Sequence, residues 1–144
     1  MFPGPWEKLT ELAAAGRLMA PREVRKELEE GDDELVPWAV QHAHLFRDPT
    51  EVELHAVIEI QAQFPDFVDP EKEKPEADPF VVALALVHNR LQAGSMLPQP
   101  CVVISEERRR RAATGRPKIP DVCDHYGIEH MNLFGLMRAE GWTF

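Results

Sequence analysis

Three acidic positions in this chain lie where carboxylates could bind a metal ion. Asp78 stands directly before the most continuously apolar segment of the sequence. Glu27 lies one helical turn from Val24 and therefore beside the apolar face of a helix. Glu106 and Glu107 follow an apolar strand, and ligands collect at the carboxyl edge of a parallel sheet. Mg²⁺ and Mn²⁺ prefer oxygen ligands, so acids brought together from separate elements predict chemistry on phosphodiesters.

Each acid also has a purely structural interpretation. Asp78 followed by Pro79 predicts a helix N-cap and the first helical residue, because proline sets a helical φ where an N–H would have no partner. Glu27 has acidic neighbours and could be an exposed helix residue. Glu106 and Glu107 could form a solvated turn. Taken one at a time, the acids leave both interpretations open.

Other kinds of active site are not indicated. The sequence has no phosphate-binding glycine loop, no GxSxG and no HExxH motif. Its six histidines show no helical pair of the zinc-protease type. Cys101 and Cys123 form no CxxC, which favours two small buried thiols over a redox pair or a thiolate zinc site. The acids are therefore the main candidates for chemistry.

The elements that must position these acids are mostly helical. Apolar spacing and boundary residues predict helices at 6–15, 21–30 and 50–64, one after Asp32-Asp33 that carries Leu35, Trp38 and Phe46, and one apolar on every side after Asp78. Residues 101–105 have the β-branched density of a buried strand, and 119–126, 128–133 and 134–140 are expected to form a helix, a short strand and a helix. A buried helix that leads into a buried strand is typical of a parallel α/β sheet.

Two details of this pattern are specific enough to test. The helix at 50–64 is expected to have an apolar side made by Val52, Val57, Ile58, Ile60 and Phe64. Residues 18–20 are expected to be only a connector, and residues 65–76, rich in proline and acids, a solvated loop. Both flanks of that loop are needed for one core, so we expect a single domain over residues 1–144.

Composition and charge restrict the possible partners. A chain of 144 residues with a formal net charge of -9 is not expected to bind nucleic acid tightly without specific contacts. Its longest apolar run is far shorter than the roughly 20 residues that cross a bilayer. The N-terminus lacks a basic region followed by an apolar stretch, so no signal peptide is indicated. We expect a cytoplasmic protein with no membrane partner.

The basic residues are concentrated in one segment. Six of the sixteen lysines and arginines lie between positions 108 and 118: Arg108, Arg109, Arg110, Arg111, Arg116 and Lys118. A solvated loop would explain this segment. Alternatively, its arginines could contact a phosphate backbone or an acidic partner.

The order of the acids resembles that of the PIN-domain nucleases. The matching elements are V-x-x-E-L around Glu27, A-D-P-F-V-V-A-L-A beginning at Ala77, and an apolar strand that runs into Ser105-Glu106-Glu107. Within that superfamily the chain is most similar to uncharacterised PIN-like proteins that carry Phe-Pro-x-x-Trp near the start and Lys-Ile-Pro-Asp-Val-Cys near the end, here residues 2–6 and 118–123. The resemblance covers essentially the whole chain.

This resemblance implies a three-layer α/β fold, helix-rich, with a small parallel sheet flanked by helices. It also implies an endoribonuclease, commonly the toxin of a bacterial type II toxin–antitoxin pair, with RNA as substrate, an antitoxin protein as partner and homodimers common. Glu27, Asp78 and Glu107 match the acids that hold Mg²⁺ or Mn²⁺. Glu106 could substitute for Glu107, and Asp121 is a further candidate that could instead cap a helix. The metal would activate a water for in-line attack on phosphorus.

The chain departs from the family pattern at its start. PIN domains begin with an apolar strand that ends in the first metal-binding aspartate, and no such strand precedes Phe2. The expectation is therefore an N-terminally truncated domain, explained by a start site placed downstream of the true one or by an inactive form. The second explanation leads to the alternative function, a non-catalytic protein-interaction module on a PIN scaffold.

Overall fold

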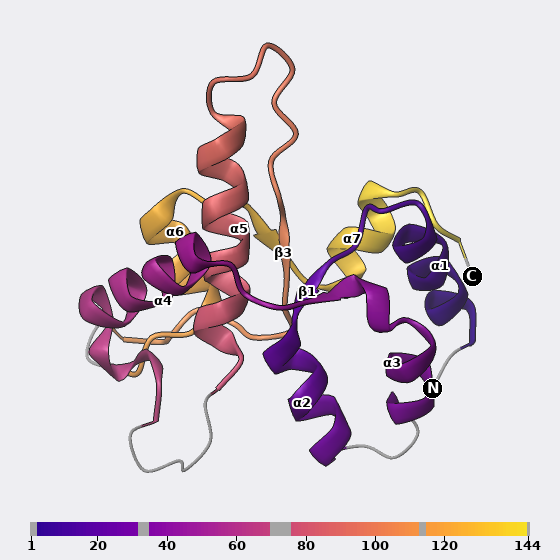
Figure 1. The fold of residues 1–144 in the computed structure, drawn as a ribbon, viewed down its shortest axis with the longest axis horizontal. Helices are drawn as coiled ribbons and strands as arrows, with labels where there is room; N and C mark the ends of the chain where they lie inside the picture. The colour runs from indigo at the N-terminus through magenta and orange to yellow at the C-terminus, as the bar shows by residue number, and fades with distance from the viewer. Residues whose placement is uncertain (1–2, 32–34, 70–75, 113–114, 144) are drawn as a thin grey trace.

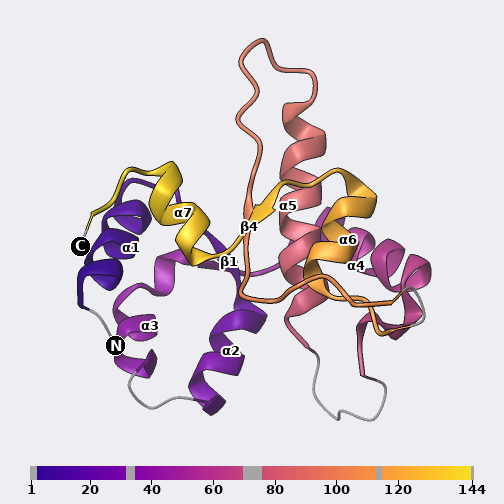
Figure 2. The ribbon, with the colours of Figure 1, turned by 180° about the vertical axis from the view of Figure 1, so that it is seen from behind.

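The computed structural model describes residues 3–31, 35–69, 76–112 and 115–143, and these form a helix-rich α/β structure (Figures 1 and 2). The helices are α1 (Pro3–Ala14), α2 (Arg22–Gly31), α3 (Leu35–Gln41), α4 (Glu51–Gln63), α5 (Asp78–Gln92), α6 (Ile119–Tyr126) and α7 (Leu133–Ala139). The strands are β1 (Ala20–Pro21), β2 (Phe46–Arg47), β3 (Val103–Ile104) and β4 (His130–Met131). Both views show α4, α5 and α6 on one side of the strands and α1, α3 and α7 on the other.

The strands form two separate parallel pairs. In the first pair Ala20 is opposite Phe46, and in the second Val103 is opposite His130. The second pair lies within the predicted strands 101–105 and 128–133, which confirms the parallel pairing but shortens both strands. The first pair was missed, because residues 18–20 were expected to be a connector and Phe46 part of a helix. Strands of two residues are too short to show a sequence period.

The apolar core lies between α4, α5 and α6. Ile60, Val82, Val122 and Cys123 are all 0% exposed, and Val103 of β3 packs into the same cluster. The prediction that the helix after Asp78 lies inside the domain is confirmed, since six of its residues are buried. Burial raises the pKa of the Cys123 thiol to about 12, so this cysteine is a neutral core residue, as predicted. Cys101 is half-buried rather than buried.

The predicted apolar side of helix α4 is confirmed at Val57, Ile60 and Phe64 but not at two other positions. Thr50 caps it with a capping box, its hydroxyl accepting from the Glu53 N–H at 3.1 Å. Its buried residues are Ala56, Val57 and Ile60, whereas Val52 and Ile58 are 60% and 64% exposed. The predicted apolar side was therefore wrong at these two positions. Ala56 is also buried in the core, although a small alanine is a weaker sequence signal for a buried face than a larger apolar residue.

Several predicted boundaries also shift or lie outside the described residues. Pro21 belongs to β1, so α2 begins at Arg22 rather than at the proline. Asp32 and Asp33, the expected start of the third helix, lie outside the described residues. Part of the predicted loop does so as well, but residues 65–67 form a 3₁₀ turn that buries Phe67 to 3% exposure. Among the described helices, none is long and apolar enough to cross a membrane.

Candidate functional site

Three of the candidate acids, each from a different part of the chain, line one cavity. This cavity has a volume of about 270 Å³, and we call it the acidic cavity. Its lining residues are Glu27, Glu76, Asp78, Glu107, Phe67, Arg116, Pro117 and Lys118. Four carboxylates thus share it with two cationic side chains.

Glu27 lies on α2 and holds the start of α5. Its Oε1 accepts a hydrogen bond from the backbone N–H of Ala77 at 2.9 Å, across 50 residues of sequence. Ala77 is only 1% exposed, so without Glu27 its N–H would have to find another partner away from solvent. Glu27 is exposed, as one of its two interpretations had it, and it also holds the buried N–H of Ala77.

Asp78 does not cap α5, which corrects the N-cap prediction. The N-cap is Ala77, whose carbonyl accepts the first helical bond from Val81 N at 3.0 Å. Asp78 is the first helical residue and Pro79 the second, one position later than predicted. The alanine at the N-cap has no side chain that can accept a hydrogen bond, so α5 has no side-chain cap, while Glu27 of α2 binds the N–H of Ala77. A carboxylate in the first turn is still favoured by the helix dipole.

Glu107 reaches the acidic cavity from the loop after β3. Its Oε2 accepts from the N–H of Ile119, the first residue of α6, at 2.9 Å. Its own N–H donates to Ser105 Oγ at 3.1 Å, which tightens the turn at the end of the strand. The loop, β3 and α6 together fix where this carboxylate lies.

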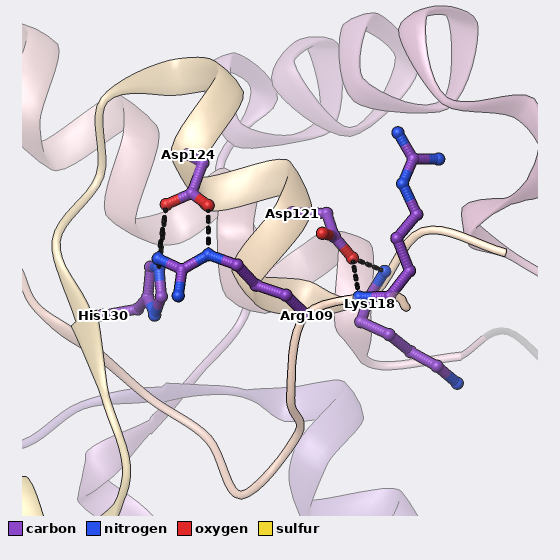
Figure 3. A network of polar contacts seen from close by, with 6 residues as sticks. Arg109, Lys118, Asp121, Asp124 and His130 are labelled. Carbon is purple, nitrogen blue, oxygen red and sulfur yellow. Dashed lines mark hydrogen bonds and ion pairs between the residues drawn. The ribbon is translucent and has the colours of Figure 1, made fainter. Parts of the chain in front are cut away.

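The two alternative acids point elsewhere. Glu106 Oε1 accepts from Leu133 N at 2.8 Å and so binds the start of α7. Asp121 Oδ2 accepts from the backbone N–H of Lys118 at 2.8 Å and of Arg110 at 3.0 Å (Figure 3). This is the capping role that was one of the two possibilities for Asp121. Among Glu106, Glu107 and Asp121, only Glu107 lines the acidic cavity.

Glu76 was not among the predicted site residues. It lies two positions before Asp78, at the end of the segment expected to be a solvated loop. The prolines and alternating charges of that segment gave no sign that its last residue, Glu76, lines the cavity. The available signal was its position next to the Ala77-Asp78 pair.

The basic residues between positions 108 and 118 have different roles. Arg109 makes an ion pair with Asp124, Nε to Oδ2 at 2.6 Å, and His130 Nε2 lies 2.9 Å from Asp124 Oδ1 (Figure 3). The Arg109 hydrogen bond, followed by that of His130, lowers the pKa of Asp124 from its ordinary value of 3.8 to about 2. Together with the bond from Arg110 N to Asp121, this pair ties the loop that carries Glu107 to α6.

A second cavity also has Glu107 in its lining. Its volume is about 220 Å³. It is lined by Ser105, Glu107, Arg108, Arg109, Pro120, His130, Met131 and Asn132. Arg110 and Arg111 line neither of the two cavities, whereas Arg116 and Lys118, from the same basic segment, line the acidic one.

Comparison with known families assigns the whole chain to one group. The model of a domain of unknown function, DUF4411, matches residues 1–144. The chain belongs to the DUF4411 family. Neither the curated proteins nor the solved structures compared with this DUF4411 chain contain a match.

The donor set of this DUF4411 chain suits a hard cation, because all four acids of the cavity offer carboxylate oxygens. Among the described residues, however, no three acids, histidines or cysteines come close enough together to form a ready metal cage. Mg²⁺ typically keeps several waters and binds through one or two carboxylates. The cavity therefore fits a hydrated ion better than one enclosed by protein ligands.

Proposed function

We propose that this chain is a metal-dependent endoribonuclease of the PIN-like type. The observation that supports it is the placement of Glu27, Asp78 and Glu107, which come from three separate elements and line one cavity. Their order along the chain also matches that of the acids in PIN-domain nucleases. Glu76 adds a fourth carboxylate to the same cavity.

In this proposal the residues of the cavity have distinct tasks. Glu27, Asp78 and Glu107 hold Mg²⁺ or Mn²⁺, with Glu76 beside them. The bound ion supplies an activated water and stabilises negative charge on the attacked phosphodiester. Arg116 and Lys118, in the same lining, attract the RNA phosphate and offset the repulsion between it and the acids.

The PIN-like three-layer architecture is the structural part of the proposal. Helix α5 packs against both β1 and β3, which belong to different strand pairs. The toxin role, the antitoxin partner and the homodimer remain predictions from the resemblance.

The test compares two adjacent glutamates. Glu107→Gln and Glu106→Gln each keep an oxygen that can accept the same backbone hydrogen bond, but only Glu107 lines the acidic cavity. RNA cleavage with Mn²⁺ should fall about 100-fold or more in Glu107→Gln and in Asp78→Asn, the size of effect seen when a group that stabilises transition-state charge is removed. Glu106→Gln should cleave like the unmodified chain. The assay is run on a protein of residues 1–144 and on a version extended by the codons upstream of Met1.

The competing function is a non-catalytic interaction module, which requires no metal ion in the acidic cavity. Thermal unfolding with and without millimolar Mn²⁺ separates the two functions. An ion that binds only the folded state must raise the melting temperature, and Asp78→Asn should remove that rise. No rise and no cleavage in either version of the chain would overturn the nuclease proposal in favour of the module.

A further inference from the structure

The acidic cavity and the second cavity share Glu107 but differ in the rest of their lining. The acidic cavity has four carboxylates and two cations, whereas the second cavity has two arginines, a histidine and the single carboxylate of Glu107. Two cavities with different charged groups thus share one glutamate in their linings. A chain of phosphates that crosses Glu107 would pass from acidic to basic surroundings.

The second cavity contains the donors that a phosphate group requires. Arg108 makes no ion pair within the described part of the chain, so its guanidinium is not held by a direct carboxylate contact there, although Glu107 lines the same cavity. Ser105 Oγ accepts from Glu107 N and can still donate its own proton, and Asn132 Oδ1 accepts from Gly135 N, which assigns the other amide atom as a donor. A guanidinium, a hydroxyl and an amide make a mixed donor set suited to phosphate oxygens.

The side of this cavity formed by Arg109 is held in place before any ligand arrives. Asp124 contacts the Nε and Nη2 atoms of Arg109, so the Nη1 group lies outside that pair. The loop itself is attached at Leu133 N through Glu106 and at Asp121 through Arg110 N. Less conformational freedom then has to be lost on binding, which raises affinity.

We propose that the second cavity binds a phosphate group of the RNA next to the one held in the acidic cavity. The identity of the polymer rests on the proposed function, whereas phosphate binding rests on the cavity alone. The ligand is either an internal backbone phosphate or the phosphate at the 5′ end. Glu107 then separates a phosphate that reacts from a phosphate that positions the strand.

The experiment measures binding without cleavage. A short single-stranded RNA with a 3′ fluorophore is titrated in EDTA at several salt concentrations, with and without a 5′-phosphate. Arg108→Gln should weaken binding about fivefold, the effect of losing one partly exposed ion pair. The slope of log affinity against log salt should fall by about 0.7, the value expected for one lost phosphate contact on a single strand. Arg138→Gln, an exposed arginine of α7 that lines neither cavity, is the control and should change neither value.

A second readout does not depend on RNA. Inorganic phosphate should shift the NMR signals of the Ser105 backbone amide and the Asn132 side-chain amide, and Arg108→Gln should remove these shifts. A binding difference between the 5′-phosphate and 5′-hydroxyl RNAs that Arg108→Gln abolishes identifies the terminal phosphate, and equal binding of the two RNAs identifies an internal one. Equal losses in Arg108→Gln and Arg138→Gln, or no phosphate shifts, would overturn the proposal.

The two proposals fail in different ways. Asp78→Asn should stop cleavage while leaving binding in EDTA as tight as before or tighter, because it removes a negative charge near the strand. A chain that never cleaves RNA but shows the Arg108-dependent binding and phosphate shifts would disprove the nuclease and keep the phosphate site. A chain that cleaves RNA but binds it equally well with Arg108→Gln would do the reverse.

Discussion

Helix α5 takes part in two regions that follow opposite rules. Its first residue, Asp78, lines the acidic cavity, while Val82 and Leu86 further along belong to the apolar core. In the core, burial alone stabilises the fold, and Val82 is 0% exposed. In the cavity, four carboxylates lie together in about 270 Å³. Like charges repel, so the grouping of the four opposes stability, although Glu27 and Glu107 also accept backbone hydrogen bonds that hold the fold.

The difference shows that a charged residue of the candidate site also holds part of the fold. The start of α5 is held by Glu27, a charged side chain from another helix, rather than by a residue of its own. Departures of this kind from local sequence rules are expected at functional sites. If the comparison is correct, substitutions in the core should change stability, and conservative ones in the cavity should change activity alone.

The largest expected effect is in the core. Ile60→Ala should lower the free energy of unfolding by about 3 to 4 kcal/mol, because Ile60 is 0% exposed and its truncation leaves a cavity between α4 and α5. Ile58→Ala is the matched control, since Ile58 lies on the same helix and is 64% exposed. Urea unfolding should show less than about 0.5 kcal/mol for this control. Similar losses for the two variants would mean that α4 turns its other face to the core.

An intermediate effect is expected at Glu27, where the two regions meet. Glu27→Ala should lower stability by about 1 to 3 kcal/mol, because it leaves the buried Ala77 N–H without its acceptor. Glu27→Gln keeps an acceptor oxygen and should unfold close to the unmodified chain. Urea unfolding of both variants measures the difference.

The same two variants separate the structural role of Glu27 from its role in metal binding at the proposed site. Glu27→Gln removes the charge but not the bond, so Mn²⁺ should no longer raise its melting temperature. If Glu27→Gln is as unstable as Glu27→Ala, the bond to Ala77 depends on the charge, and the separation between core and cavity does not hold at this residue.

Much of the core half of the comparison could be predicted from the sequence. The Asp78-Pro79 start and the continuous apolar run after it together indicate a buried helix, and β-branched residues at 101–105 mark the strand that follows. The exposed face of α4 could not be predicted, because Val52 and Ile58 have the same chemistry as the buried Val57 and Ile60. Only the position of α5 decides which of them is covered.

For the acidic cavity, the sequence predicts three of its acids but not the hydrogen bonds that they make. Glu27, Asp78 and Glu107 were chosen from their order, and the structure brings them into one lining. The bond from Ala77 to Glu27 spans 50 residues, so no local pattern reveals it, and the cap was assigned to Asp78 instead. Likewise, Glu106 and Glu107 are chemically identical neighbours. Only the positions of α6 and α7 show that they point to different partners.

The smallest effect is expected where the loop of Glu107 is tied to α6. Asp124 has a pKa lowered to about 2 in the folded chain, so its ionised form stabilises the fold at pH values above its ordinary pKa of 3.8. This contribution is lost as the pH falls through about 2. Because the Asp124 side chain is 46% exposed, Asp124→Asn should cost less than about 1 kcal/mol at pH 7.

Urea unfolding at pH 7, 4, 3 and 2 follows this difference between Asp124→Asn and the unmodified chain. The difference should be constant down to about pH 4, shrink below it and vanish near pH 2, and 1 M salt should reduce it because the pair is exposed. Asp66→Asn is the control, since the Asp66 carboxylate makes no ion pair among the described residues. A difference that persists unchanged at pH 2 would show that the charge of Asp124 is not what holds the loop. The position of Glu107 between the two cavities would then depend on its bond to Ile119 and on the neighbouring bond of Glu106 to Leu133.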